Sequence, residues 1–272
     1  MQPVLWTKGV LLTPQHLQAQ DRFLEDQLQF QLSALTFCPW GFHRLELNRE
    51  ALAGGAVAIS RATGIFPDGL LFDFPDADAA PGPKPLEGTF EPDQQTLDVY
   101  LAVPERRPGG SNVSAAQKDR NTRYVAEVLV RRDENSGLGE KPIQVARKNL
   151  RLLLEGEALD GYSVLPVARI IRSPAGDYTF DPNFVPPLVD LSASDFLLSV
   201  MRRLVEILTA KSSTLSGTRR QRNQSLAEFS ISDVGSFWLL YTINTHLPPL
   251  RHLYETRRGH PAQLFSAMSA LA

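Results

Sequence analysis

The sequence predicts an α+β multidomain protein: an antiparallel β-sandwich or barrel with an N-terminal helix, followed by an α-helical bundle. Three stretches of hydrophobic patterning predict this fold. Residues 15–36 have a helical period, residues 43–185 hold short runs rich in β-forming residues, and the chain returns to a helical period after residue 194. We therefore expect a β-rich domain at residues 1–185 and a helical domain at residues 186–272.

The first helix is expected to follow Pro14, because proline is tolerated in a first turn and the Gln, Leu, Glu and Ala residues after it favour a helix. Phe23 and Phe30 form one apolar stripe of this helix. A second stripe, more than a quarter turn away at about 100° per residue, consists of leucines: Leu17, Leu24, Leu28 and Leu35. A helix that is apolar on two sides lies between two surfaces, so we expect one stripe to face the chain's own β domain and the other a neighbour or partner.

The central region reads as short strands separated by proline and glycine. Residues 54–75 hold two β-like runs around Pro67-Asp68-Gly69, a sequence typical of a turn. Further runs continue the pattern at residues 96–104, 123–133, 143–156 and 162–173. This spacing favours antiparallel pairing over βαβ units. Residues 76–88 and 105–121 are expected to be loops.

Prolines in residues 181–194 predict an extended connector to the helical domain. Ser192 stands three residues before Asp195, which resembles the start of a capping box. Apolar residues then recur in steps of four and three, with Lys211 at the skipped position: Leu197, Met201, Leu204, Leu208 and Leu215. A second helix is expected at residues 232–247, where two prolines then kink or restart the chain, and a third at Pro261. This period suits a bundle or a coiled coil, which several chains can share.

Composition excludes several classes of protein. With 28 Lys and Arg against 30 Asp and Glu, the net charge of −2 gives no overall field that would recruit nucleic acid or an anionic membrane. Lys8 interrupts the apolar N-terminal residues, so no signal peptide is expected, and no stretch approaches the roughly 20 apolar residues of a membrane span. Cys38 is the single cysteine, so an internal disulfide is excluded. We expect a cytoplasmic protein.

The sequence offers no convincing catalytic, cofactor or metal site. Residues 136–142 (SGLGEKP) lack the spacing of a phosphate-binding loop, and Cys38 between aromatic residues is more typical of a small buried residue than of a nucleophile. The basic residues at 219–224 are typical of a solvated helix end. The three C-terminal histidines do not share a helical face: His246, His252 and His260. We expect a protein that is not an enzyme, binds no cofactor or metal, and uses its surplus apolar surface for assembly.

Residues 6–23 (WTKGVLLTPQHLQAQDRF) resemble the N-terminal signature of the TssK family, the trimeric baseplate subunits of bacterial type VI secretion systems. The family pattern is approximately W-x-E-G-[aliphatic]-x-[aliphatic]-x-P-Q-H-F-Q-x-x-D-R-[aromatic]; Lys8 and Leu17 depart from it. Further family-like blocks occur in the same order along the chain, among them residues 149–170, 180–194 and 239–253.

The resemblance implies a non-enzymatic structural adaptor that forms a homotrimer. Residues 1–185 would be a β-rich shoulder similar to that of phage receptor-binding proteins, and residues 186–272 a helical neck. The shoulder would contact the TssF/TssG wedge. A head domain that follows the neck in the family would contact the TssJ-TssL-TssM membrane complex, and this chain ends before it. The resemblance places the protein in the cytoplasm, at a baseplate docked on the inner membrane.

The apolar and signature residues form our hypothesis for the assembly and partner surfaces, with those of the neck wrapped around an axis shared by three chains: Trp6, Leu11, Leu12, Pro14, Gln15, His16, Phe23, Phe30, Leu197, Met201, Leu204, Leu208, Phe237, Trp238 and Tyr241. No nucleic acid and no inserted membrane segment are expected. A trimeric carbohydrate- or receptor-binding β-module with a helical stalk is the alternative from another functional class. A glycan screen separates the two, because an adaptor should bind wedge proteins and no sugar.

Overall fold

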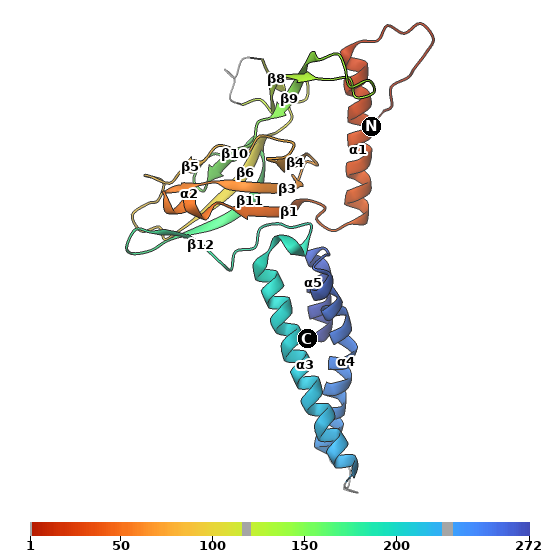
Figure 1. Ribbon diagram of the computed structural model, residues 1–272, viewed down its shortest axis with the longest axis vertical. Helices are drawn as coiled ribbons and strands as arrows, with labels where there is room; N and C mark the ends of the chain where they lie inside the picture. Colours follow the sequence, from red (N-terminus) through yellow and green to blue (C-terminus); the bar gives the residue numbers. More distant parts are fainter. Residues whose placement is uncertain (1, 116–120, 225–230) are drawn as a thin grey trace.

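The computed structural model describes residues 2–115, 121–224 and 231–272, which form a β-rich part and a long helical part below it (Figure 1). The predicted α+β class is confirmed, since several antiparallel sheets occur together with helices. Helix α1 (Pro14–Leu35) stands beside the β-rich part and begins at the predicted proline. The N-terminal arm before it, residues 2–13, has no regular secondary structure.

Two sheets and a small pair of strands build the β-rich part. The first sheet has the order β1-β3-β4 and the second β10-β6-β11-β12, with antiparallel neighbours in both. Their bounds are β1 (Gly41–Leu47), β3 (Ile59–Ile65), β4 (Leu71–Phe74), β6 (Thr96–Pro104), β10 (Arg151–Leu154), β11 (Tyr162–Arg172) and β12 (Tyr178–Phe180). The short helix α2 (Arg49–Ala53) leads into β2 (Ala56–Val57), which pairs with β5 (Lys84–Pro85).

An aromatic cluster fills the core of this part. Phe72 lies 5.0 Å from Phe66 and 5.6 Å from Phe42 between ring centroids, and all three side chains are buried. The predicted turn at Pro67-Asp68-Gly69 is confirmed: Gly69 has a φ of 84°, and the Phe66 amide donates to the Leu70 carbonyl at 2.9 Å.

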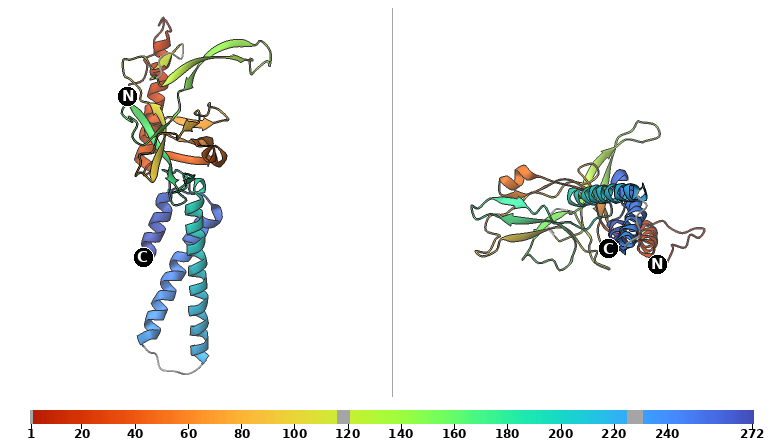
Figure 2. Two further views of the ribbon diagram at one scale, coloured as in Figure 1. Left: turned by 90° about the vertical axis from the view of Figure 1, so that its left-hand side faces the viewer. Right: turned by 90° about the horizontal axis from the view of Figure 1, so that it is seen from below.

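A separate ribbon projects from the β-rich part. Strand β8 (Tyr124–Arg131) pairs antiparallel with β9 (Lys141–Lys148), and the short β7 (Val113–Ser114) pairs with the first residues of β8. The two views of Figure 2 show this ribbon extending away from the sheets. Residues 116–120 of the loop predicted at 105–121 lie outside the described residues.

The connector predicted from its prolines packs against the first sheet. The Phe42 amide donates to the Pro187 carbonyl at 2.8 Å, and the Val189 amide donates to the Phe42 carbonyl at 3.0 Å. Gly41 permits this approach, because a Cβ there would lie 2.6 Å from the Pro187 carbonyl carbon.

The helical part consists of α3 (Asp195–Gln224), α4 (Ile231–Thr256) and α5 (Pro261–Leu271). Helices α3 and α4 form a hairpin, and α5 lies against α4 near the β-rich part (Figure 1). The three helices share one hydrophobic core with Leu191: Met201, Val205, Leu208, Ile243, Leu247, Leu250, Leu253 and Leu264.

One sequence-based detail of the helical part is wrong, and one of two alternatives is excluded. Ser194, not Ser192, lies at the start of α3, where its Oγ accepts from the Leu197 amide at 3.3 Å; the Ser192 amide is instead bonded to Asp190 in a 3-10 turn (Leu191–Ala193). Of the kink or restart predicted at Pro248 and Pro249, the restart does not occur, because both prolines lie inside the continuous helix α4. Both prolines are exposed, so water can satisfy the carbonyl groups that lose their helical donors.

Candidate interaction surfaces

The N-terminal arm is attached to α1 through His16. The Trp6 ring lies 5.9 Å from the His16 ring, and the Thr13 amide donates to His16 Nδ1 at 3.3 Å. The imidazole therefore caps the first turn of α1 and also holds the tryptophan. The other predicted residues of this segment are exposed: Leu11, Leu12, Pro14 and Gln15.

Helix α1 has no buried residue, although it is rich in leucine and phenylalanine. The four leucines of its stripe are between 48% and 85% exposed. Phe23 is half-buried, but Phe30 on the same stripe is 63% exposed. Polar side chains make part of the contact with the chain's own β domain, as Gln29 does beside Gly69. Among the described residues, neither stripe is fully covered, which leaves most of the apolar surface of α1 available to another molecule.

An aromatic cluster lies on the exposed side of α4. The ring centroid of Trp238 is 5.5 Å from that of Phe237 and 5.8 Å from that of Tyr241, and all three residues are exposed. The guanidinium carbon of Arg219 stands 5.1 Å from the centre of the Phe237 ring. Arg222, the remaining basic residue of the patch after Arg219 and Arg220, has a side chain outside the described part of the structure.

The predicted neck residues divide into two groups. Met201 and Leu208 are buried in the core of one chain, so they hold its three helices together rather than present a surface. Leu197 and Leu204 are half-buried at the edge of that core. The aromatic cluster on α4 is the exposed part of the predicted set.

The β8–β9 ribbon is an exposed surface that the sequence interpretation missed. Its apolar side chains are uncovered on both faces, among them Val128, Val130 and Ile143, and so is Leu138 in its turn. The run at residues 123–133 was interpreted as an ordinary strand. Its succession of apolar residues at adjacent positions was the available signal, because such a strand needs cover on both faces.

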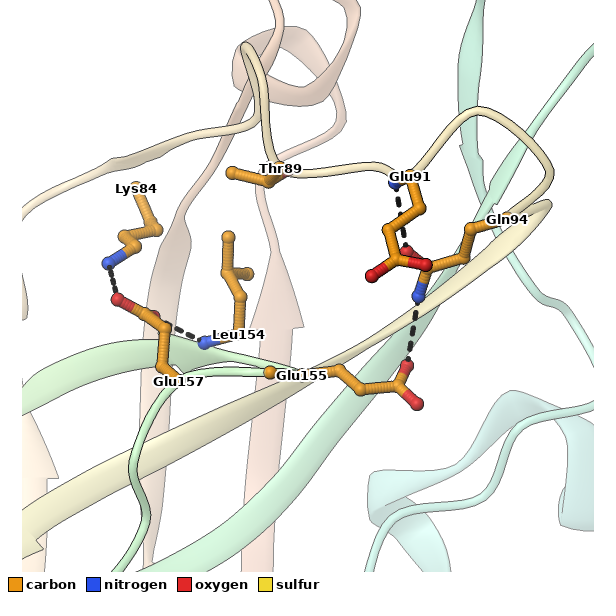
Figure 3. Close-up of a pocket in the computed structure, with 8 residues that line it drawn as sticks. Lys84, Thr89, Glu91, Gln94, Leu154, Glu155 and Glu157 are labelled. Atoms are coloured by element: carbon orange, nitrogen blue, oxygen red, sulfur yellow. Dashed lines mark hydrogen bonds and ion pairs between the residues drawn. The ribbon is translucent and has the colours of Figure 1, made fainter.

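A hollow beside the turn after β10 is lined by several carboxylates and has a volume of about 650 Å³ (Figure 3). Glu157 Oε1 accepts from Lys84 Nζ at 2.7 Å, and Glu157 Oε2 accepts from the Leu154 amide at 2.7 Å. Glu155 Oε2 accepts from the Asp98 amide at 3.1 Å. These carboxylates fix the turn. Within the described residues, no group of three or more His, Cys, Asp or Glu side chains is arranged to hold a metal ion.

Glu157 predicts an acid-sensitive contribution to stability. Burial by itself raises the pKa of Glu157, but hydrogen bonds from Lys84 and the Leu154 amide, with the Lys84 charge, outweigh it and lower that pKa. The contribution is therefore complete above the unfolded pKa, near 4.5, and is lost as the pH falls through the lower folded value. We expect Glu157→Gln to reduce the change in free energy of unfolding across this pH range. The reduction should be less than about 1 kcal/mol, because the Glu157–Lys84 pair is partly solvated. Urea unfolding at a series of pH values tests this, and parallel profiles for both proteins would contradict it.

An apolar hollow of about 340 Å³ lies where the β-rich part meets α5. His260 joins the two: its Nδ1 accepts from the Ala262 amide at 3.2 Å, and its Nε2 donates to the Cys38 carbonyl at 3.2 Å. A histidine therefore does approach Cys38, but its hydrogen bond goes to the backbone and not to the thiol. Phe37 and Phe265 are exposed beside this hollow.

Replacing His260 is expected to loosen the junction. His260→Ala removes the N-cap of α5 and the bond to Cys38, at a cost of about 1 kcal/mol in free energy of unfolding. His260→Asn keeps a capping oxygen but is too short to reach Cys38, so its loss should be smaller. Urea unfolding measures both variants. If both unfold at the same urea concentration as the unaltered protein, His260 does not stabilise the junction.

Known proteins match the chain in sequence and in fold. The family model described as "Bacterial Type VI secretion, VC_A0110, EvfL, ImpJ, VasE" matches residues 16–272. The type VI secretion system baseplate component TssK1 of Pseudomonas aeruginosa is 31% identical over 272 residues, which cover 99% of this chain and 60% of TssK1. The chain thus spans less than two thirds of this relative.

Solved structures give the same result. A chain from the structure of the TssK-TssF-TssG baseplate subcomplex superposes with a TM-score of 0.87 at 27% identity, covering 100% of this chain and 86% of the other. The crystal structure of TssK superposes with a TM-score of 0.85 at 30% identity, covering 97% and 59%. No helix within the described residues is long and apolar enough to cross a membrane. The matches in sequence and fold agree along nearly the whole chain, which therefore belongs to the TssK family of bacterial type VI secretion proteins.

Proposed function

We propose that this protein is a non-enzymatic structural adaptor of a type VI secretion baseplate. The observation that carries the proposal is α1, a helix of 22 residues without one buried side chain. Such a helix leaves apolar area in water unless another chain covers it, and each Å² that becomes covered is worth about 25 cal/mol. The relatives described above, a baseplate component and a TssK-TssF-TssG subcomplex, support assembly as the role of this surface.

The adaptor would form a homotrimer. In this proposal residues 1–185 are the shoulder, residues 186–272 are the neck, and three necks meet through the α4 cluster of Phe237, Trp238 and Tyr241. The three rings are exposed in one chain and lie within 6.5 Å of one another, as the centre of an interface would require.

The proposed partners lie at the two ends of the adaptor. The shoulder, with the N-terminal arm, would bind TssF and TssG, because the subcomplex similar to this chain contains those proteins. The link to TssL and TssM would be made by the head domain that the family resemblance implies. The adaptor would act in the cytoplasm, at a baseplate docked on the inner membrane.

Sedimentation and co-purification test the proposal. We expect the protein to sediment as a trimer at micromolar concentration and to retain co-expressed TssF and TssG on an affinity column. The same protein should give no signal in a glycan screen. A stable monomer that captures neither wedge protein would contradict the adaptor function, and specific sugar binding would favour the receptor-binding alternative.

A further inference from the structure

The β8–β9 ribbon lacks cover of its own. Its eight residue pairs run from Tyr124↔Lys148 to Arg131↔Lys141, and most of its side chains beyond Val125 are at least partly exposed. A two-stranded ribbon is at best marginally stable when it stands alone in water. A surface that packs against the ribbon would therefore stabilise it.

One face of the ribbon combines apolar side chains with unpaired positive charge. Leu129 lies opposite Ile143, and on the same face Arg131 lies opposite Lys141. Like charges directly opposite each other destabilise a ribbon. Among the described residues, neither Arg131 nor Lys141 forms an ion pair, whereas the neighbouring Arg132 pairs with Glu140. This face fits a surface that is apolar and acidic.

The leucine stripe of α1 has these two properties. Helix α1 carries three carboxylates against one guanidinium, that of Arg22. Arg22 lies 3.3 Å from Glu25 and 3.7 Å from Asp26, which leaves Asp21 as an exposed carboxylate with no ion pair among the described residues. Asp21 stands about one helical turn from both Leu17 and Leu24, at the edge of the leucine stripe. The unpaired acid of α1 and the unpaired bases of the ribbon thus each lie beside exposed leucine or isoleucine.

The ribbon and α1 lie at the same end of the molecule but point apart. The ribbon lies above the sheets, on the side away from α3 and α4, and α1 runs alongside the sheets up to the level of the ribbon (Figure 1). The side view and the view from below separate them, with the ribbon directed away from its own α1 (Figure 2). Two complementary surfaces that face different directions can form a head-to-tail contact between copies, which gives a ring when the rotation between the copies closes.

We infer that the ribbon of one copy lies on the leucine stripe of α1 in the next copy. Arg131 and Lys141 face Asp21, and Leu129 and Ile143 pack on Leu24 and Leu28. The inference rests on the proposed self-association of the chain and names the surfaces that make it at the shoulder. The proposed partner of the ribbon is thus a second copy of this chain and not a different protein.

Disulfide trapping tests this contact. Two differently tagged full chains, both carrying Cys38→Ser, are co-expressed; one also carries Ile143→Cys and the other Leu24→Cys. After purification and oxidation of the thiols by air, the expected result is a disulfide that links the two differently tagged chains on a non-reducing gel, which requires the two Cα atoms within about 7 Å. Gln144→Cys is the matched control, because adjacent residues of a strand point to opposite faces. A trimer without the Ile143→Cys product, or with equal trapping at residue 144, overturns the inference while the proposed adaptor stands; a monomer contradicts the adaptor itself.

Charge exchange provides a second measurement. We expect Arg131→Glu with Lys141→Glu to weaken self-association by about 10-fold or more, and Asp21→Lys in the same chain to restore at least part of it. All three substitutions are at exposed positions, so the fold of the single chain should be unaffected. Weakening without any recovery would show that Asp21 does not face the two basic residues, and would overturn the inference.

Discussion

Trp238→Asp is expected to weaken self-association by about 100-fold while the single chain stays folded. Trp238 is 58% exposed and lies between Phe237 and Tyr241, so an interface would bury most of its ring. Losing that burial and placing a carboxylate there costs about 3 kcal/mol per copy, and each 1.4 kcal/mol is about a factor of ten. Sedimentation velocity over a concentration series measures the effect, and the thermal unfolding of the monomer should change little.

Two further variants determine whether the effect belongs to the neck. Ala115→Asp adds the same charge at an exposed position of the 105–121 loop and should leave assembly intact. Leu204→Asp should impair both assembly and stability, because Leu204 is half-buried against the core of the three helices. If Trp238→Asp and Ala115→Asp assemble equally well, the α4 cluster is not an interface.

The periodicity of the sequence predicted which residues share a face, but not which chain covers that face. The steps of four and three in α3 correctly placed Met201 and Leu208 on one stripe, and the structure covers this stripe with α4 of the same chain. The leucine stripe of α1 has the same kind of pattern, but its four leucines stay exposed in the described part of the chain. Local sequence patterns contain no information about the surface of a partner. The pattern therefore predicted burial correctly in α3, where α4 of the same chain covers the stripe, but not in α1.

Local sequence signals succeeded where the chemistry depends on near neighbours. Pro14 and the turn at Pro67-Asp68-Gly69 were predicted correctly, because fixed φ values and glycine conformations act within a few residues. The start of α3 was predicted wrongly at Ser192, because the 3-10 turn that places Ser194 at the helix start is not visible in the local sequence pattern. The ion pair of Asp68 and Arg123 joins residues 55 positions apart, and no local pattern points to it.

Asp68→Asn is expected to lower the free energy of unfolding by about 3 kcal/mol, because it leaves a buried guanidinium without its carboxylate. The side chain of Arg123 is 7% exposed and donates through one nitrogen to Asp68 Oδ2 at 2.6 Å and to the Pro104 carbonyl at 3.0 Å. Burial by itself lowers the pKa of Arg123, but the hydrogen bond and charge of Asp68 outweigh it and raise that pKa. Asparagine keeps an oxygen that can accept from the Leu70 amide, so the turn is preserved.

The matched controls separate this loss from a general effect of removing a charge. Glu140→Gln breaks the exposed pair with Arg132, whose side chain is 70% exposed, and should cost less than about 0.5 kcal/mol. Adding Arg123→Met to Asp68→Asn should recover part of the stability, because the uncompensated charge is then removed from the interior. Urea unfolding of the three variants gives the comparison. If Asp68→Asn costs no more than Glu140→Gln, Asp68 does not hold the base of the β8–β9 ribbon against the turn after β3.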